Sequence, residues 1–228
     1  MATKNQTRDD VIDSIISVFR SEGYEGASLA KMSQATGLGR SSLYHYFPLG
    51  KEDMANAALE RLGILMHVDI LGPLAGPGSA RQRLSDFVAK ITGFYEDGRR
   101  PCLLDVFSVG DAAKMFQDGL RQANRAFIQA ISELAASTGA SPAEAARRGE
   151  DALIAIEGAL IVSRGLATSD PFRRVLAELP DRVLGWAQLK RREHQDIDRE
   201  PGDHPDAYVD QPGSEIVQRL VAAYQQHK

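Results

Sequence analysis

The stretch from Gly37 to Ala55, "GLGRSSLYHYFPLGKEDMA", holds the residues of this chain whose types and spacing best suit a chemical task. Large side chains follow one another from Leu43 to Phe47, with a basic residue on each flank, Arg40 and Lys51. A tyrosine phenol is rigid and amphipathic, and it donates a hydrogen bond to a phosphate oxygen. A lysine at a helix start adds its charge to the free backbone N–H groups, and both favour a phosphate. The pattern therefore favours contact with a sugar-phosphate backbone.

Short helices must position these side chains, and the surrounding sequence predicts them. Apolar residues recur at helical spacing over residues 11–19, and Gly23 closes that stretch as a C-terminal cap does. Ser28 is a good N-cap for a second short helix. A glycine turn at residues 37–39 then precedes a third helix over residues 40–47, which the next residue, a proline, stops.

Three short helices with a tight glycine turn before the third form a helix-turn-helix pattern. In such a pattern the third helix enters the DNA major groove, and its early residues meet base edges. Those early residues are Arg40, Ser41 and Ser42. Leu43 and Phe47 are four residues apart, so we expect them to face the core. The residues left for the rim of the groove are Tyr44, His45 and Tyr46.

The segment Leu29 to Met54, "LAKMSQATGLGRSSLYHYFPLGKEDM", is similar to the DNA-binding domain of the TetR family of transcriptional repressors. "FPLGKED" and, later, "RPCLLDVF" resemble the LmrA/YxaF-type branch of that family. The resemblance implies a homodimer that binds a double-stranded DNA operator. The expected location is the cytoplasm, because the sequence shows neither a membrane helix nor a signal peptide. It also implies a C-terminal domain that pairs through its last two main helices and holds a pocket for a small-molecule effector. The DNA-contacting residues that it implies are Ser28, Lys31, Arg40, Ser41, Ser42, Tyr44, His45, Tyr46 and Lys51.

One departure from the family concerns the cap of the third helix. Many members carry serine or threonine where this chain has Gly39. We therefore expect this helix to lack a side-chain cap, at a cost of a few tenths of a kcal/mol. A phosphate contact is lost with it.

The composition is that of an ordinary globular protein: 228 residues, 43% hydrophobic, 25% charged and a formal net charge of -4. The single cysteine, Cys102, excludes an internal disulfide and a cysteine-based zinc site. No apolar run approaches the ~20 residues of a membrane helix, and the polar start lacks the apolar core of a signal peptide. The acidic balance argues only weakly against nucleic acid, because the position of the basic groups matters more than their sum.

The remaining sequence also reads as helices, so the predicted class is all-α. We expect an N-terminal three-helix DNA-binding domain over residues 1–50, and an antiparallel helical bundle for dimerisation and ligand binding over residues 51–228. Asp111 is expected to cap a long helix, and Pro180 to kink or split another. The other predicted segments are helices at 51–68, 80–97, 142–166 and 214–226, a break of Gly, Pro and Ser at 72–79, a short apolar segment at 102–109 and a polar loop at 190–212.

Glu157 lies within the apolar sequence "DALIAIEGALIVSRGL", where a carboxylate is costly unless it is paired. Two interpretations remain open: a group that binds the effector, or a structural carboxylate that pairs with an arginine such as Arg164 or lies at a dimer contact. The candidate pocket residues are Phe94, Phe107, Phe116, Phe127 and Glu157, although most of the aromatics suit an ordinary core equally. A stripe of small residues, Ala152, Ala155, Gly158 and Ala159, fits a dimer interface or internal packing.

Other functions have less support in the sequence. A helical enzyme that uses Glu157 or the tyrosines as acid or base lacks a phosphate loop, a nucleophile motif and a two-carboxylate site. A helical ligand-binding adaptor without DNA binding conflicts with the intact Arg40 and Lys51. Cys102 is expected to be an inert buried thiol rather than a redox sensor. No cofactor or metal site is expected, although His194, His204 and nearby aspartates gather in the polar loop.

Overall fold

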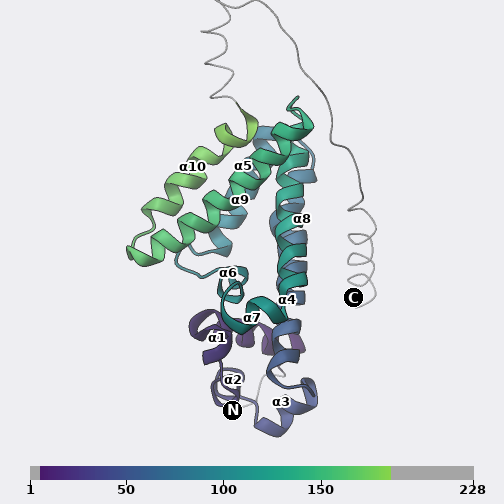
Figure 1. Ribbon diagram of the computed structural model, residues 1–228, viewed down its shortest axis with the longest axis vertical. Coiled ribbons are helices and arrows are strands. Elements are labelled where there is room, and N and C mark those ends of the chain that lie inside the picture. Colours follow the sequence, from purple (N-terminus) through teal and green to yellow (C-terminus); the bar gives the residue numbers. More distant parts are fainter. Residues whose placement is uncertain (1–5, 186–228) are drawn as a thin grey trace, which may run out of the picture. The chain divides into compact units, whose positions relative to one another are not determined.

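The computed structural model describes residues 6–185, which form helices without a strand (Figure 1). In chain order these are α1 (Arg8–Gly26), α2 (Leu29–Thr36), α3 (Arg40–Tyr46), α4 (Lys51–Leu65), the π-helix η1 (Met66–Leu71), the 3-10 helix η2 (Gly72–Ala75), α5 (Ala80–Phe94), α6 (Leu103–Phe107), α7 (Gly110–Met115), α8 (Gln117–Ala136), α9 (Pro142–Gly165) and α10 (Asp170–Leu184). The predicted all-α class is confirmed. The predicted loop at 190–212, with its His and Asp residues, and the helix at 214–226 lie outside the described residues.

The first two helices begin at side-chain caps, of which Ser28 was predicted. Thr7 and Asp10 form a capping box at the start of α1, because the Thr7 hydroxyl accepts from the Asp10 backbone N–H and the Asp10 carboxylate accepts from that of Thr7. Gly23 has a φ of 70°, so the regular part of α1 ends there, as the sequence predicts. Ser28 caps α2 by accepting a hydrogen bond of 3.3 Å from the Lys31 backbone N–H.

The predicted cap at Asp111 is wrong. Asp111 lies inside the short helix α7, and the long helix α8 begins only after Phe116. Gly110 takes a φ of 66°, and the Asp111 backbone N–H donates to the Glu25 carboxylate of α1 at 3.1 Å. A side chain distant in sequence therefore caps this helix. The expected split at Pro180 is also not observed, because α10 runs through it as one helix.

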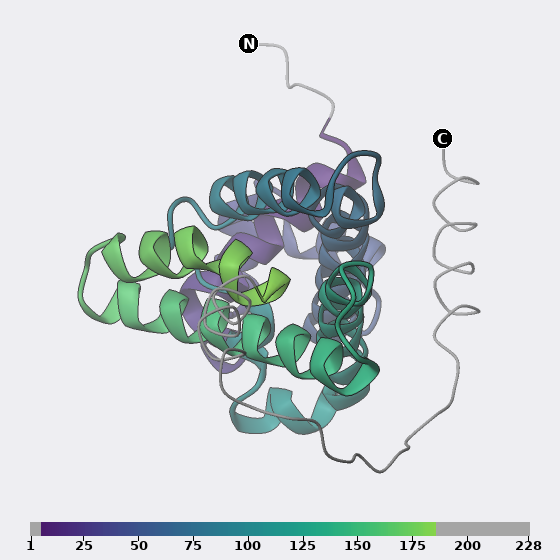
Figure 2. The same ribbon diagram turned by 90° about the horizontal axis from the view of Figure 1, so that it is seen from above.

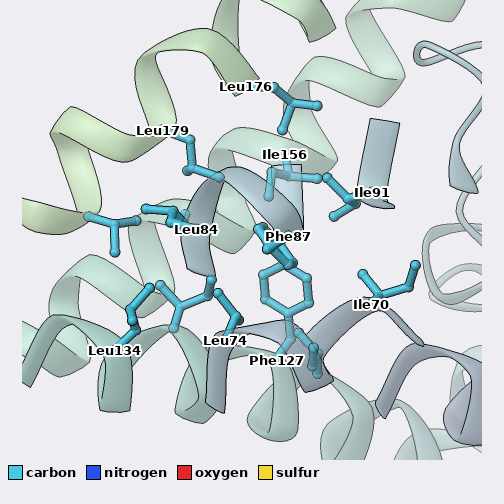
Figure 3. Packing of buried hydrophobic residues seen from close by; sticks show 14 of the residues in the cluster. Ile70, Leu74, Leu84, Phe87, Ile91, Phe127, Leu134, Ile156, Leu176 and Leu179 are labelled. Atoms are coloured by element: carbon cyan, nitrogen blue, oxygen red, sulfur yellow. The ribbon is translucent and has the colours of Figure 1, made fainter. Parts of the chain in front are cut away.

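Four helices, α5, α8, α9 and α10, surround one hydrophobic cluster together with η1 and η2 (Figure 2). Figure 3 shows its centre, where Phe87 of α5 meets Phe127 of α8 edge to face, with ring centroids 5.8 Å apart. Gly149 allows α9 to approach α8 closely. A Cβ atom at Gly149 would lie 2.4 Å from the Ile128 carbonyl oxygen and 2.3 Å from the Ser132 hydroxyl.

A second cluster joins α1–α4 to α6, α7 and the start of α8. Phe19 and Tyr24 of α1 pack against Phe107 of α6, with ring centroids 5.2 and 5.7 Å from it. Phe116 stacks on Phe107 at 5.3 Å. Aromatic packing of this kind fixes α1 firmly against the short helices α6 and α7.

Candidate DNA-binding surface

The turn between α2 and α3 is held by side chains of α2. Gly37 ends α2 in the left-handed conformation, with a φ of 70°. The Ser33 hydroxyl donates to the Leu38 carbonyl oxygen at 2.6 Å, and the Leu38 N–H donates to the Thr36 hydroxyl at 3.3 Å. Thr36 is itself buried and donates to the Met32 carbonyl oxygen. These bonds hold the turn between the two helices, and buried Met32 and Leu43 join both helices to the same core.

Helix α3 has one buried and one exposed side, as its sequence predicts. Leu43 and Phe47 are 0% and 1% exposed, so they anchor the helix to the α1–α4 core. The exposed residues are Arg40, Ser41, Ser42, Tyr44, His45 and Tyr46. Gly39 caps α3 with no side-chain hydrogen bond, which confirms the expected loss. The early turn of α3 therefore presents a guanidinium and two hydroxyls to the outside of the protein.

The other predicted DNA contacts already have intramolecular partners. The Ser28 hydroxyl is the N-cap of α2, and the Lys31 ammonium pairs with Glu22 of α1 while donating to the Gly26 carbonyl oxygen at 3.3 Å. Both residues are exposed, in the first turn of α2 or just before it. Exposed pairs of this kind cost little to break. The Lys31 side chain is therefore free to exchange Glu22 for a phosphate.

Lys51, at the start of α4, is more firmly held. Its ammonium donates to the Tyr24 carbonyl oxygen at 3.0 Å and lies 4.4 Å from the centroid of the Tyr24 ring. The lysine thus joins the start of α4 to the end of α1. The backbone N–H groups of the first turn of α4 lie beside it, and they are the groups that favour a phosphate there.

A link from α1 to α7 was not predicted from the sequence. The Glu25 carboxylate accepts the Asp111 backbone N–H, and backbone hydrogen bonds lower the pKa of Glu25. Glycine suits position 110, because its φ of 66° is left-handed and a Cβ atom there would lie 2.7 Å from Glu25 Oε1, so the carboxylate would have to shift. No sequence pattern near Glu25 predicts its contact with Asp111, because the two residues are far apart in the sequence.

Glu157 of α9 lies in a buried polar group rather than in a salt bridge. The Tyr95 hydroxyl donates to the Cys102 sulfur at 3.4 Å, and burial, followed by the Glu157 charge, raises the pKa of the Cys102 thiol. Burial raises the pKa of Glu157 and of Tyr95. The expected Glu157–Arg164 pair is not among the ion pairs of the described residues: Arg164 binds Asp105 of α6 at 3.1 Å, and its charge acts on Glu157 only by lowering the pKa of that carboxyl. The interpretation of Glu157 as an effector group stays a prediction.

The five candidate pocket residues lie in different surroundings. Phe107 and Phe116 are buried against α1, and Phe127 is buried between α5 and α8. Phe94 is half-buried and lines a cleft beside Arg20. Within residues 6–185 no group of His, Cys, Asp and Glu side chains is arranged to hold a metal ion. The same residues contain no helix that is long and apolar enough to cross a membrane.

The small-residue stripe of α9 is divided between two sides. Ala152 and Ala159 are buried in the cluster that α5, α8, α9 and α10 surround, whereas Gly158 is exposed. The outer side of α9 instead carries large apolar residues that the sequence pattern did not single out: Ile154, Ile161, Val162 and Leu166. They are 47–65% exposed. An apolar row of this length on one helix is typical of a protein–protein contact.

Comparison with known proteins finds a family model that matches the N-terminal part of the chain, and two relatives. Residues 11–58 match the family model "Bacterial regulatory proteins, tetR family". The HTH-type regulator YxaF of Bacillus subtilis is 30% identical over 63 residues, which are 28% of this chain and 33% of that protein. The match to YxaF thus spans about a third of that relative. LmrA of the same organism is 21% identical over 184 residues, 77% of this chain and 95% of LmrA.

The solved structures agree on the fold. A cysteine mutant of the TetR-family regulator CifR, complexed with 26-base-pair operator DNA, matches 81% of this chain and 100% of its own, with a TM-score of 0.63 and 21% identity. At that identity the likeness concerns the fold alone. The family model, however, covers α1, α2, α3 and the first half of α4, which are the elements that carry the exposed side of α3. Residues 11–58 of this chain thus match the TetR family of bacterial regulatory proteins.

Proposed function

We propose that this chain is a transcriptional repressor that leaves a palindromic operator when a small molecule binds to it. The observation that carries the proposal is the exposed early turn of α3. Arg40, Ser41 and Ser42 stand there on a helix whose opposite side, Leu43 and Phe47, is fully buried. A rigid helix with polar side chains at its start is what major-groove reading requires. The operator complex of CifR, a protein of the same fold, supports this use of the helix.

In the proposed complex the residues divide by role. Arg40, Ser41 and Ser42 meet base edges, where an arginine fork best matches guanine. The residues that contact mainly the sugar-phosphate backbone are Ser28, Lys31, Tyr44, His45, Tyr46 and Lys51. Backbone contacts fix the position of the domain on DNA, whereas base contacts select the sequence.

The proposed repressor is a homodimer in the cytoplasm. The exposed apolar side of α9, with Ile154, Ile161 and Leu166, supports a contact between two copies. A two-fold dimer carries two copies of α3, and these read half-sites about one helical turn or more apart. The proposed division of labour places DNA binding in residues 1–50, and dimerisation and effector binding in residues 51–228.

Release requires an effector that binds better to a form whose two α3 helices no longer match the operator. The effector and the operator then weaken each other by the same factor. The Glu25–Asp111 and Phe19–Phe107 contacts provide a physical link for such coupling, because they join α1 to α6 and α7. The family match favours this function over the alternatives of an enzyme or an adaptor without DNA binding.

The test is selection of bound duplexes from a random DNA pool by the purified protein at about 150 mM salt. A recovered palindrome confirms a dimeric, sequence-specific regulator and supplies a probe for effector screening. The control is the same selection with an Arg40→Ala variant, which is expected to recover a less defined motif. If the wild type enriches no sequence above a scrambled control, the proposed function is wrong.

A further inference from the structure

A cleft of about 670 Å³ lies where α1 and α4 meet the segment that follows α5. This volume is that of a typical small-molecule site. The apolar part of its lining is Ile16, Leu62, Leu65, Phe94 and Pro101. The charged part is Asp13, Arg20, Glu96, Arg99 and Arg100. The cleft is thus amphipathic, and three arginines outnumber two carboxylates.

The carboxylates of the lining are already engaged. Asp13 of α1 accepts hydrogen bonds from the Arg61 guanidinium of α4 at 3.3 and 3.4 Å. Glu96 pairs with Arg100, whose guanidinium also donates to the Phe94 carbonyl oxygen at 2.9 Å. Arg99 is mostly exposed and lies 3.9 Å from Asp97. Both carboxylates of the cleft are therefore paired with other arginines, and Glu96 acts on Arg20 only through its charge, without a direct contact.

Arg20 stands out among these arginines. Its guanidinium carbon lies 5.3 Å from the centroid of the Phe94 ring. Its Nε atom is buried and has no hydrogen-bond partner among the described residues. A buried donor without an acceptor is costly, and in native proteins it usually marks a place that an acceptor fills. Burial, followed by the nearby Arg100 charge, lowers the pKa of Arg20, so the charged guanidinium is less favourable here than in water.

We infer that this cleft binds a small organic monoanion, an aliphatic or aromatic carboxylate, with Arg20 as its counterion. An arginine guanidinium presents a planar fork that matches a carboxylate, and such charge-assisted hydrogen bonds are strong. The apolar body of the ligand packs against Ile16, Leu62 and Leu65. A single negative charge balances the single excess positive charge of the lining.

The place of the cleft gives this ligand a structural consequence. Its walls come from α1 and α4, which carry the reading helix, and from residues 94–101, which continue α5. A bound carboxylate therefore ties these two parts together. The inference does not rest on the proposed function, since ligand binding is measured on the protein alone.

The test is calorimetric titration of the full-length protein, without DNA, with octanoate and 2-naphthoate. Their neutral isosteres, octanamide and 2-naphthamide, report the part of binding that does not need the charge. The dianion 2-naphthyl phosphate distinguishes a phosphate site from a carboxylate site. The expected result is that at least one carboxylate binds at least about tenfold more tightly than its amide and than the phosphate.

Variants of Arg20 complete the test. Arg20→Leu is expected to lose carboxylate binding by at least about tenfold, whereas Arg20→Lys keeps the charge and binds more weakly than the wild type. Arg125→Leu, an exposed arginine of α8 outside the cleft, is the matched control and is expected to bind as the wild type does. If Arg20→Leu does not fold, the comparison of Arg20→Lys with the wild type decides. The inference is overturned if neither carboxylate binds, if the amides bind equally well, or if the Arg20 variants bind unchanged.

Discussion

The Lys51 ammonium donates a hydrogen bond of 3.0 Å to the Tyr24 carbonyl oxygen and lies over the Tyr24 ring. This contact joins the first turn of α4 to the end of α1, just beyond the break at Gly23. Lys51, for which the TetR resemblance implies a phosphate contact, therefore also stabilises the protein in the absence of DNA. The two roles are separable by experiment.

Lys51→Met is expected to lower the free energy of unfolding by about 1–2 kcal/mol, because it removes a hydrogen bond from a charged donor and a cation–π contact. Lys31→Met is expected to lower it by less than about 1 kcal/mol, because the Lys31–Glu22 pair is exposed. Both changes are expected to reduce the salt dependence of DNA binding by about one unit of slope. Denaturant unfolding and DNA titrations at several salt concentrations check the two parts. Equal losses of stability would contradict the structural role of Lys51.

Arg40→Ala is expected to leave stability unchanged, because the side chain is exposed at the start of α3. It is expected to weaken binding to the selected operator by about 1–3 kcal/mol and to relax the preference at one base position. Operator variants at each position, titrated with wild type and variant, measure this. Arg125→Ala on α8 serves as the control for a simple loss of one positive charge. An unchanged preference at every position would remove Arg40 from the base-reading residues.

The reading helix could be predicted from the sequence because its determinants are local. Leu43 and Phe47 are one turn apart, Pro48 ends the helix and the glycines at 37 and 39 make the turn, so a short segment contains the whole pattern. The cap at Ser28 was predictable for the same reason, and it accepts the expected backbone hydrogen bond. The TetR resemblance rested on this same segment, and the family match confirms it.

The contacts between distant segments could not be predicted in this way. Aspartate is a common helix-capping residue, which is why Asp111 was expected to be a cap. Its backbone N–H instead donates to the carboxylate of Glu25, 86 residues away. Arg164 has Glu157 on its own helix, yet it binds Asp105 of α6. In both cases the sequence pattern suggests a partner within the same helix. The actual partner comes from another helix, which only the tertiary fold brings near. The sequence gives no reason to distinguish Arg20 from any other arginine on a helix. Only the tertiary fold brings Phe94 of α5 next to its guanidinium.

Gly149→Ala is expected to destabilise the protein by about 1–3 kcal/mol, because the new Cβ atom meets the backbone of α8 and one helix must move away. Gly63→Ala in α4 is the matched control. Nothing lies within 4 Å of a Cβ at Gly63, so the helix preference of alanine is expected to stabilise the protein by about 0.5–1 kcal/mol. Denaturant unfolding of the two variants gives the comparison. If both variants change the free energy of unfolding in the same direction, the close contact of α8 and α9 is contradicted.

Ile161→Glu is expected to convert a dimer into a monomer. The residue lies on the exposed apolar side of α9, and a carboxylate there would be buried without a partner in the contact between two copies. Sedimentation equilibrium measures the mass of wild type and variant over a range of concentrations. Val109→Glu is the control, because Val109 is as exposed as the residues of this row but precedes α7. A variant that keeps the wild-type mass would place the dimer contact elsewhere.

Cys102 is expected to be unreactive in the folded protein. Burial, followed by the nearby Glu157, raises the pKa of the Cys102 thiol to about 12, so almost no thiolate forms near neutral pH. Alkylation by iodoacetamide at about pH 8 is therefore expected to be slow in the folded protein and fast in denaturant. The chain has one cysteine, so the extent of labelling reports this residue alone. Comparable rates in the two states would show an accessible thiol and would favour a redox role.

The same pKa gives the sign of an alkaline effect on stability. The folded state holds the thiol proton above the ordinary value of 9.0, so the contribution of this group to stability is fully present below pH 9. It is lost as the pH rises through about 12. The alkaline decrease in the free energy of unfolding is therefore expected to be smaller in Cys102→Ala, which has no thiol to titrate. Unfolding curves for both proteins across this range test the assignment, and parallel curves would contradict it.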